Sequence, residues 1–129
     1  MGDELEFIHM LGKETRRRII AILLDGRSYR DLAALLGVTP AAIAKYISGA
    51  THPSDKTIAR AIESASRTER EEIAIAIAED LSVGLSSLVE WIIDERLPGQ
   101  VLAKSLEENL ARLRLAGVAR RARIAGART

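Results

Sequence analysis

The chain has 129 residues and a formal net charge of +1, and it is 47% hydrophobic and 29% charged, with no cysteine. This length predicts one compact domain, or one small domain with an extension, and the hydrophobic fraction excludes wholesale disorder. The lack of cysteine excludes a disulfide scaffold, a Cys-containing zinc site and a thiol nucleophile. Taken as one number, the near-neutral charge argues against a nucleic-acid binder.

The charge is, however, unevenly divided along the chain. Residues 67–110 hold four basic and ten acidic side chains, whereas residues 111–129 hold six arginines and no acid. Such asymmetry says more about partners than the total does. Two interpretations stay open: an acidic helical face that attracts the basic tail of its own chain, or a tail that contacts an outside partner.

The predicted elements are helices, so we expect an all-α fold: a compact bundle of four to five helices followed by a C-terminal helical extension. The first helix spans about residues 5–24, with a possible break near Gly12. Ser28 and Thr39 cap two short helices that end at Gly37 and Gly49, glycines being suited to a helix end with positive φ. Ser54 caps a fourth helix.

The second half of the chain predicts three further helices. Thr68 and Glu71 form a capping-box pattern for a helix over residues 68–81. Residues 73–78 alternate Ile and Ala, which by period alone permits a strand, but the cap and the alanines favour a helix. The next helices span residues 85–97 and 101–115. The sequence from Gly117 onward has too few apolar residues to pack and predicts a flexible tail.

Residues 28–49 carry the most specific pattern in the chain. Two short helices separated only by Gly37-Val38-Thr39 must cross steeply, with Ala33 allowing a close approach and Ile43 filling the angle. This is the physical pattern of a helix-turn-helix, whose second helix can enter the DNA major groove. The simpler alternative is a pair of packed helices without a nucleic-acid role.

The sequence resembles the Cro/CI-like (XRE) family of helix-turn-helix DNA-binding domains over about residues 14–66. The resemblance lies in Leu32-Ala33, the turn Leu36–Thr39, Ile43, Gly49, and Pro53-Ser54 followed by Thr57-Ile58. It implies a bundle of about five helices. The opening segment also looks like that of winged-helix regulators such as the ArsR group, but Pro53-Ser54 stands where a wing would need a β-hairpin.

The resemblance implies that residues 39–48 form the recognition helix. Many family members carry Gln where this chain has Tyr29 and Pro40, so hydrogen bonding to bases would rest mainly on Lys45. Tyr46 is either a base contact or a half-buried core residue. The predicted base-contacting residues are Thr39, Pro40, Ala41, Ala42, Ala44, Lys45 and Tyr46. Alanine and proline can touch a thymine methyl group but cannot hydrogen-bond a base edge through their side chains, so phosphate contacts and DNA shape gain weight.

Polar and basic residues flank this helix. The predicted phosphate-contacting residues are Arg27, Ser28, Tyr29, Arg30, Thr51, His52 and Lys56. Residues 16–18 are three consecutive arginines, which form either a solvated face with partners such as Glu14 or a further phosphate contact.

Residues 67–115 exceed what the DNA-binding bundle needs, and their apolar stripes require a partner surface. They either pack on the bundle or pair with a second copy, and we favour a homodimer, because a two-fold dimer doubles the base contacts. The expected interface residues are Leu88, Trp91, Ile92, Leu102, Leu106, Leu110 and Leu113. Trp91 is either an interface anchor or a core residue.

The sequence therefore divides into a DNA-binding domain over residues 1–66, a dimerisation or interaction region over residues 67–116 and a flexible basic tail over residues 117–129. The tail arginines are Arg120, Arg121, Arg123 and Arg128. Basic arms of this kind follow DNA, but this one could equally bind RNA or the acidic helices.

Signals for catalysis are weak. The two histidines, His9 and His52, are far apart, and the single Glu6-x-x-His9 pattern supplies at most two metal ligands. We expect no enzymatic activity, no cofactor and no metal. The acidic N-terminus does not resemble a signal peptide, and no apolar stretch reaches the roughly 20 residues that a membrane helix needs. We expect a cytoplasmic, nucleoid-associated protein without a membrane partner.

Together these features predict a sequence-selective binder of double-stranded DNA, a transcriptional repressor acting as a homodimer. One alternative is an antitoxin-like protein whose residues 67–115 hold a protein partner. Another is a repeat-binding or chromatin-associated protein. The excess of Arg over Lys and the scarcity of Asn and Gln hint at a thermophilic source.

Overall fold

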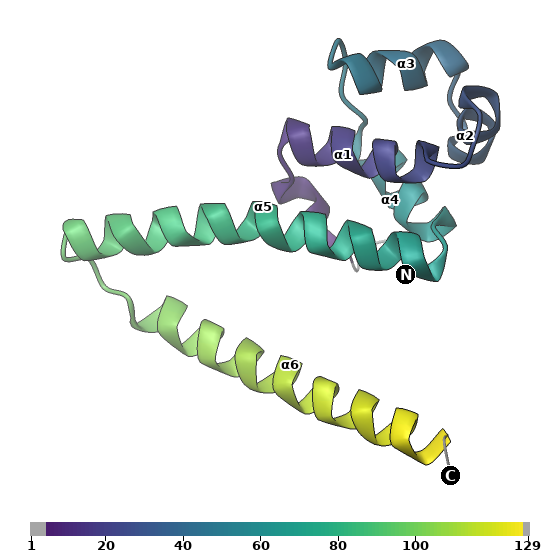
Figure 1. Cartoon of the computed structure of the whole chain (residues 1–129). Coiled ribbons are helices and arrows are strands. Elements are labelled where there is room, and N and C mark those ends of the chain that lie inside the picture. Colours follow the sequence, from purple (N-terminus) through teal and green to yellow (C-terminus); the bar gives the residue numbers. More distant parts are fainter. Residues whose placement is uncertain (1–4, 128–129) are drawn as a thin grey trace. The chain divides into compact units, whose positions relative to one another are not determined.

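The computed structural model describes residues 5–127, and every regular element within them is helical (Figure 1). The all-α prediction is confirmed. The elements are η1 (Glu6–Met10), α1 (Lys13–Leu24), α2 (Tyr29–Leu36), α3 (Pro40–Ser48), α4 (Asp55–Ser64), α5 (Arg67–Asp94) and α6 (Gln100–Ala127). The chain divides into two compact units, residues 1–85 and residues 86–129. No helix in the described part of the chain is long and apolar enough to span a membrane.

Side-chain caps start the short helices of the first unit where the sequence predicts them. The Ser28 hydroxyl accepts a hydrogen bond from the Asp31 N–H at 3.0 Å, Thr39 accepts one from the Ala42 N–H at 3.0 Å, and Ser54 accepts one from the Thr57 N–H at 3.2 Å. Each cap satisfies a backbone donor that lacks a partner within its helix. The break near Gly12 is also present, because a 3₁₀ helix ends before it and α1 begins after it.

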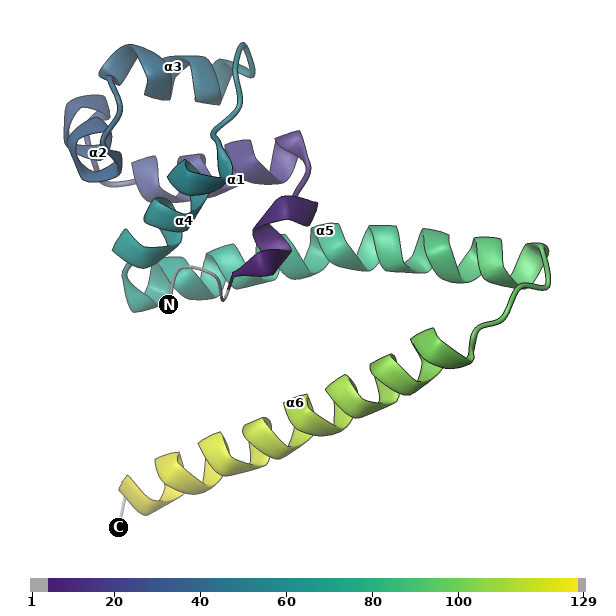
Figure 2. The same cartoon turned by 180° about the vertical axis from the view of Figure 1, so that it is seen from behind.

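The core of the first unit lies where η1 and five α-helices meet. Its largest fully buried side chains come from four helices: Ile19, Ile20 and Leu23 from α1, Leu32 and Leu36 from α2, Ile43 from α3 and Ile58 from α4. α5 adds Ile73 and Ile77 to the same cluster. α3 and the first half of α5 lie on opposite sides of this bundle, with α1 and α4 between them (Figures 1 and 2). The first part of the predicted extension therefore packs on the bundle.

The predicted capping residue of the helix after residue 66 is wrong by two positions. The capping box is formed by Ser66 and Glu69, not by Thr68 and Glu71: the Ser66 hydroxyl accepts from the Glu69 N–H at 3.2 Å, and the Glu69 carboxylate accepts from the Ser66 N–H at 2.8 Å. Both patterns fit the motif, but Glu69 is also bonded by Arg27, and this tertiary contact selects the earlier cap.

The predicted break between residues 81 and 85 is also wrong. α5 runs from Arg67 to Asp94 without interruption, and the only positive-φ glycines among the described residues are Gly26, Gly37 and Gly49. Gly84 lies inside the helix, where glycine costs only about 1 kcal/mol relative to alanine, so it does not end the helix. The chain leaves α5 at Arg96, whose φ of 55° is left-handed, and Leu97 donates back to the Ile92 carbonyl at 2.9 Å.

The last helix is longer than predicted. α6 extends to Ala127, so residues 117–127, which the sequence predicted to belong to a flexible tail, continue the helix. Their alanines and arginines are strong helix formers, which sustain a helix without burial. No residue of α6 is buried among those whose side chains the structure describes. Arg128 lies outside the described residues.

Candidate nucleic-acid interface

The turn between α2 and α3 is built around Gly37. Its φ of 70° allows the chain to reverse, and the N–H of Val38 donates to the Ala33 carbonyl at 3.0 Å. Because Gly37 has no side chain, the Arg60 Nη1 can lie close to it and donate to the Leu36 carbonyl at 3.3 Å. A Cβ atom at residue 37 would stand only 2.1 Å from this nitrogen. α4 thus supplies a side chain that binds the end of α2 and holds the turn.

α3 has one buried side and one exposed side. Ile43 is fully buried, and Tyr46 and Ile47 are half-buried against the same core. The exposed side carries Pro40, Ala41, Ala44 and Lys45, with Thr39 at its start, while Ala42 is half-buried. The structure therefore groups most of the predicted base-contacting residues on one surface, and it places Tyr46 against the core.

The chemistry of this exposed surface is simple. Proline and alanine present only carbon and hydrogen, and the Thr39 hydroxyl already accepts the Ala42 N–H. The Lys45 ammonium has no ion pair with any described residue, so it is available to an outside acceptor. The surface can thus offer methyl contacts, one cation and the hydroxyl proton of Thr39.

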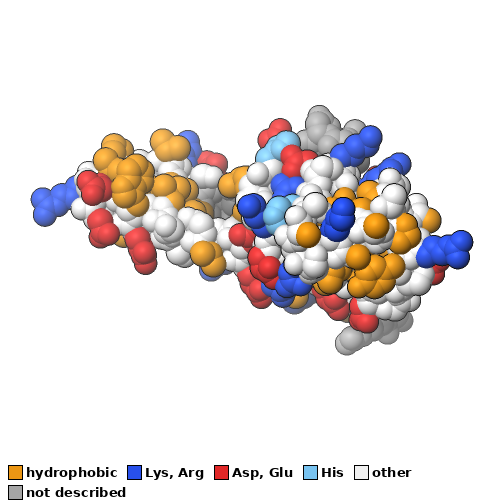
Figure 3. Space-filling model, turned by 90° about the horizontal axis from the view of Figure 1, so that it is seen from above, with side chains coloured by type: hydrophobic (Ala, Val, Ile, Leu, Met, Phe, Trp, Pro, Cys, Tyr) orange, Lys and Arg blue, Asp and Glu red, His pale blue; other side chains and the backbone are white. Residues whose placement is uncertain are grey.

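Further polar and basic side chains border α3. Tyr29 and Arg30 lie in the first turn of α2, Thr51 and His52 lie in the loop after α3, and Lys56 lies in the first turn of α4; all are exposed. Ser28 is also exposed, with its hydroxyl capping α2. Figure 3 looks down on the side of the bundle that carries α3, where Lys, Arg and His side chains surround hydrophobic ones.

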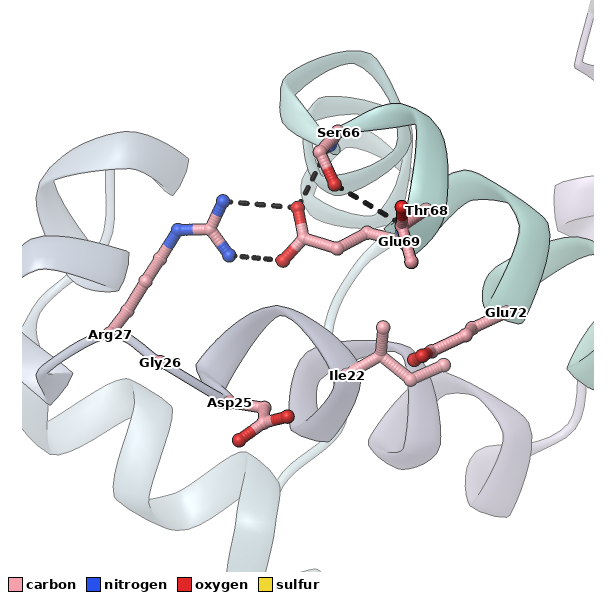
Figure 4. Close-up of a pocket in the computed structure, with 8 residues that line it drawn as sticks. All are labelled: Ile22, Asp25, Gly26, Arg27, Ser66, Thr68, Glu69 and Glu72. Carbon is pink, nitrogen blue, oxygen red and sulfur yellow. Dashed lines mark hydrogen bonds and ion pairs between the residues drawn. The ribbon is translucent and has the colours of Figure 1, made fainter.

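Arg27, predicted as a phosphate contact, is engaged within the protein. Its guanidinium binds both carboxylate oxygens of Glu69, at 2.5 and 3.1 Å (Figure 4). It also donates to the Leu23 carbonyl at 2.5 Å. The hydrogen bond from Arg27 lowers the pKa of Glu69 to about 2, despite the opposing effect of burial, and the Ser66 N–H adds to the lowering. This pair joins the start of α5 to the loop before α2.

Arg16 forms a hub that the sequence did not reveal. Its side chain is only 11% exposed and donates to the carbonyls of Ile8, Leu11 and Pro53 at 2.8, 3.1 and 3.1 Å, and to Asp55 at 2.6 Å. The hydrogen bond from Arg16 holds the pKa of Asp55 below its usual value, with a smaller contribution from His9. The hub fixes the C-terminal end of the loop that carries Thr51 and His52.

The other two arginines of this run also have carboxylate partners. Arg17 pairs with Glu14, as the sequence suggested, and Arg18 pairs with Glu79 of α5 at 2.6 Å. The sequence signal for Arg16 was hidden, because its partners are three backbone carbonyls and one acid 39 residues away.

The predicted interface residues lie at the end of α5 and along α6. Leu88, Trp91, Leu106, Leu110 and Leu113 are exposed, whereas Ile92 and Leu102 are half-buried. Trp91 is 57% exposed, so within one chain it is not a core residue. The tail residues Arg120, Arg121 and Arg123 are exposed on α6. Among the described residues no group of three or more His, Asp or Glu side chains could hold a metal ion.

Comparison with known proteins agrees with this geometry. Residues 20–64 match the family model described as helix-turn-helix, a span that covers the last turn of α1, from Ile20 to Leu24, and all of α2, α3 and α4. No curated protein and no solved structure matches the chain. This match supports the resemblance to Cro/CI-like (XRE) helix-turn-helix domains that the turn and cap residues carry.

Proposed function

We propose that this protein is a sequence-selective binder of double-stranded DNA that acts as a homodimeric transcriptional repressor. The observation that carries the proposal is the exposed side of α3. It is an uncovered surface of small apolar side chains around one free lysine, on the second helix of a helix-turn-helix. A helix of this kind fits the major groove, where base pairs are distinguished by their edges.

The side chains of α3 predict the class of site. Pro40, Ala41 and Ala44 can pack on thymine methyl groups, and Lys45 can donate to guanine O6 and N7. We therefore expect each half-site to contain thymines beside a guanine. Thr39 can add one donor through its hydroxyl proton.

Phosphate contacts would fix the register of α3 on the DNA. Tyr29 and Arg30 border it on the side of α2, and Thr51, His52 and Lys56 border it on the other side. Contacts to phosphate position a protein without reading sequence. The acidic residues Glu71, Glu72 and Glu79 belong to α5, across the bundle from α3, so DNA bound to α3 is kept from that repulsive surface.

Selection of bound fragments from genomic DNA at physiological salt tests the function. We expect a recurring palindromic site, since a two-fold dimer reads two equal half-sites. A control selection with a chain in which Ala41 and Ala44 are both replaced by Glu should recover no site, because acidic side chains repel the duplex. Equal enrichment of unrelated fragments by both chains would refute sequence-selective binding.

The base-reading hypothesis has its own test. Each thymine of the selected site is replaced in turn by deoxyuridine, which lacks only the methyl group. We expect affinity to fall about two- to fivefold at the thymines that α3 touches, a size typical of one buried methyl group. No loss at any position would show that α3 does not read methyl groups.

The repressor role and the nucleoid association that follows from it are tested with a reporter whose promoter overlaps the selected site. Expression of the chain should lower transcription, and a rise would identify an activator. Co-purification of an equimolar second protein that displaces the homodimer would favour the antitoxin-like alternative.

A further inference from the structure

The second unit leaves an apolar stripe of α6 uncovered. At its start, Leu102 and Leu106 line a groove with Val89 and Ile92 of α5. Beyond that groove the stripe continues without cover, and the exposed fractions of Leu106, Leu110 and Leu113 are 39%, 47% and 71%. Exposed leucines at helical spacing on one stripe indicate a surface that is buried by association.

The sequence around Leu110 is suited to pair with itself. Leu106 and Leu113 stand four and three residues on either side of Leu110, so the stripe is nearly the same when its direction is reversed. Glu107 precedes Leu110 and Arg114 follows it. Because these two charged residues are seven residues apart, about two helical turns, they lie on the same edge of the stripe.

This arrangement distinguishes the direction of pairing. Suppose that two copies of α6 run antiparallel about a two-fold axis near Leu110. The same edge of the stripe then faces its counterpart on the other helix. Glu107 of each copy therefore lies next to the partner's Arg114. A parallel pair would instead place the arginine-rich ends of α6 side by side. Those ends carry Arg120, Arg121 and Arg123 with no nearby acid on α6, so a parallel pair would be repulsive.

We infer that a second copy of this chain covers the α6 stripe in antiparallel orientation. In this arrangement, Asp94 and Glu95, which lie where α5 is followed by α6, would approach the arginine-rich end of the partner's α6. The acidic residues of each copy then attract the arginines of the other copy, and no parallel arrangement gives this attraction. The inference rests on the proposed homodimer and names its interface and its direction.

Cysteine cross-linking tests the direction, and the chain is suited to it because it has no native cysteine. Asn109 lies beside the expected axis, so full-length Asn109→Cys should form a disulfide-linked dimer under mild oxidation. Gln100→Cys lies about ten residues from the axis, which places its two copies roughly 30 Å apart. It should not cross-link alone, but it should cross-link to Arg121→Cys when the two variants are mixed.

A parallel pair would cross-link Arg120→Cys to itself, because Arg120 lies on the stripe seven residues after Leu113, whereas an antiparallel pair keeps its two copies roughly 30 Å apart. Self-cross-linking of Arg120→Cys would overturn the antiparallel inference. A wild-type chain that sediments as a monomer at micromolar concentration would overturn the interface altogether. These measurements need no DNA. Failure to bind DNA would refute the proposed function while leaving the pairing intact, so the two failures are distinguishable.

Charge reversal tests the predicted ion pairs. Glu107→Arg should raise the dimer dissociation constant about tenfold or more, because each of the two symmetric pairs changes from attraction to repulsion. The double change Glu107→Arg with Arg114→Glu should restore dimerisation. The matched control is Glu108→Arg. Glu108 is the next residue along the chain, but it lies on the side of α6 that points away from the leucine stripe, and it pairs with Lys104 of its own helix at 4.0 Å. An equal effect of the control and of Glu107→Arg would refute the assigned pairs.

Discussion

The ion pair between Arg27 and Glu69 predicts an acid-sensitive contribution to stability. In the unfolded chain the Glu69 carboxyl titrates near 4.5, whereas in the folded chain its pKa is about 2. This difference corresponds to about 3 kcal/mol of preferential stabilisation of the ionised form, as an upper limit for a partly exposed pair. The Glu69 and Arg27 side chains are 16% and 26% exposed, so solvent screening is limited.

Because the folded pKa is depressed, the stabilisation is complete above the unfolded pKa and is lost as the pH falls from about 4.5 to 2. Glu69→Gln keeps an oxygen that can accept from the Ser66 N–H but loses the charge. At pH 7 its free energy of unfolding should therefore be about 1–3 kcal/mol lower than that of the wild type. The difference between the two proteins should shrink towards zero near pH 2.

Urea denaturation followed by circular dichroism at pH 7, 4 and 2.5 measures this difference. The control is Glu71→Gln, which removes an exposed ion pair between Arg67 and Glu71 at 3.2 Å and should cost about 0.5 kcal/mol or less. If Glu69→Gln and Glu71→Gln were equally stable at pH 7, or if the loss from Glu69→Gln did not depend on pH, the electrostatic reasoning would be refuted.

Four further predictions test other parts of the molecule. Lys45→Ala should weaken specific DNA binding by about 1–3 kcal/mol and non-specific binding by less, and equal losses in a titration would show that Lys45 does not read bases. Gly37→Ala should destabilise the bundle by about 1–2 kcal/mol, since φ is 70° and the new Cβ displaces Arg60, whereas Gly49→Ala, at φ 81° with no neighbour within 4 Å, should cost less in thermal unfolding. Gly84→Ala should raise stability by about 0.5–1 kcal/mol, because the position is open and inside α5; destabilisation would argue for a break there. Replacing Arg120, Arg121 and Arg123 by Gln should raise the dimer dissociation constant, and a flatter salt dependence of DNA binding with unchanged dimerisation would assign these arginines to DNA instead.

The sequence predicted the first four helices well because their signals are local. Ser28, Thr39 and Ser54 cap helices through bonds that span three residues, and Gly37 and Gly49 end helices through their own backbone conformation. The start of α5 was misplaced for the opposite reason. Two capping patterns overlap within six residues, and only the contact between Glu69 and Arg27, 42 residues apart, decides between them.

The same division between local and distant signals applies to the candidate site. The exposed side of α3 follows from its period, since Ile43 and Ile47 turn Ala41, Ala44 and Lys45 outward. The roles of the arginines did not follow from the sequence. Consecutive arginines look alike in sequence, yet Arg16 is nearly buried among carbonyl groups while Arg17 pairs with a neighbour on its own helix. Their environments depend on which loops and acids the fold brings to them.

The net charge of +1 conceals surfaces of opposite sign that have separate consequences. Across the first unit, the side of α3 offers Lys45, Arg30 and Lys56 to a polyanion, while the acids of α5 lie on the other side. Along α6, the acids lie before Leu110 and the arginines lie after it, and this order favours a reversed copy of the same helix. A two-fold axis near Leu110 would also be the symmetry axis of a palindromic DNA site. Fragment selection and cysteine cross-linking therefore test one axis by independent means, and a palindromic site bound by a chain that cross-links in parallel would require the dimer to be held elsewhere.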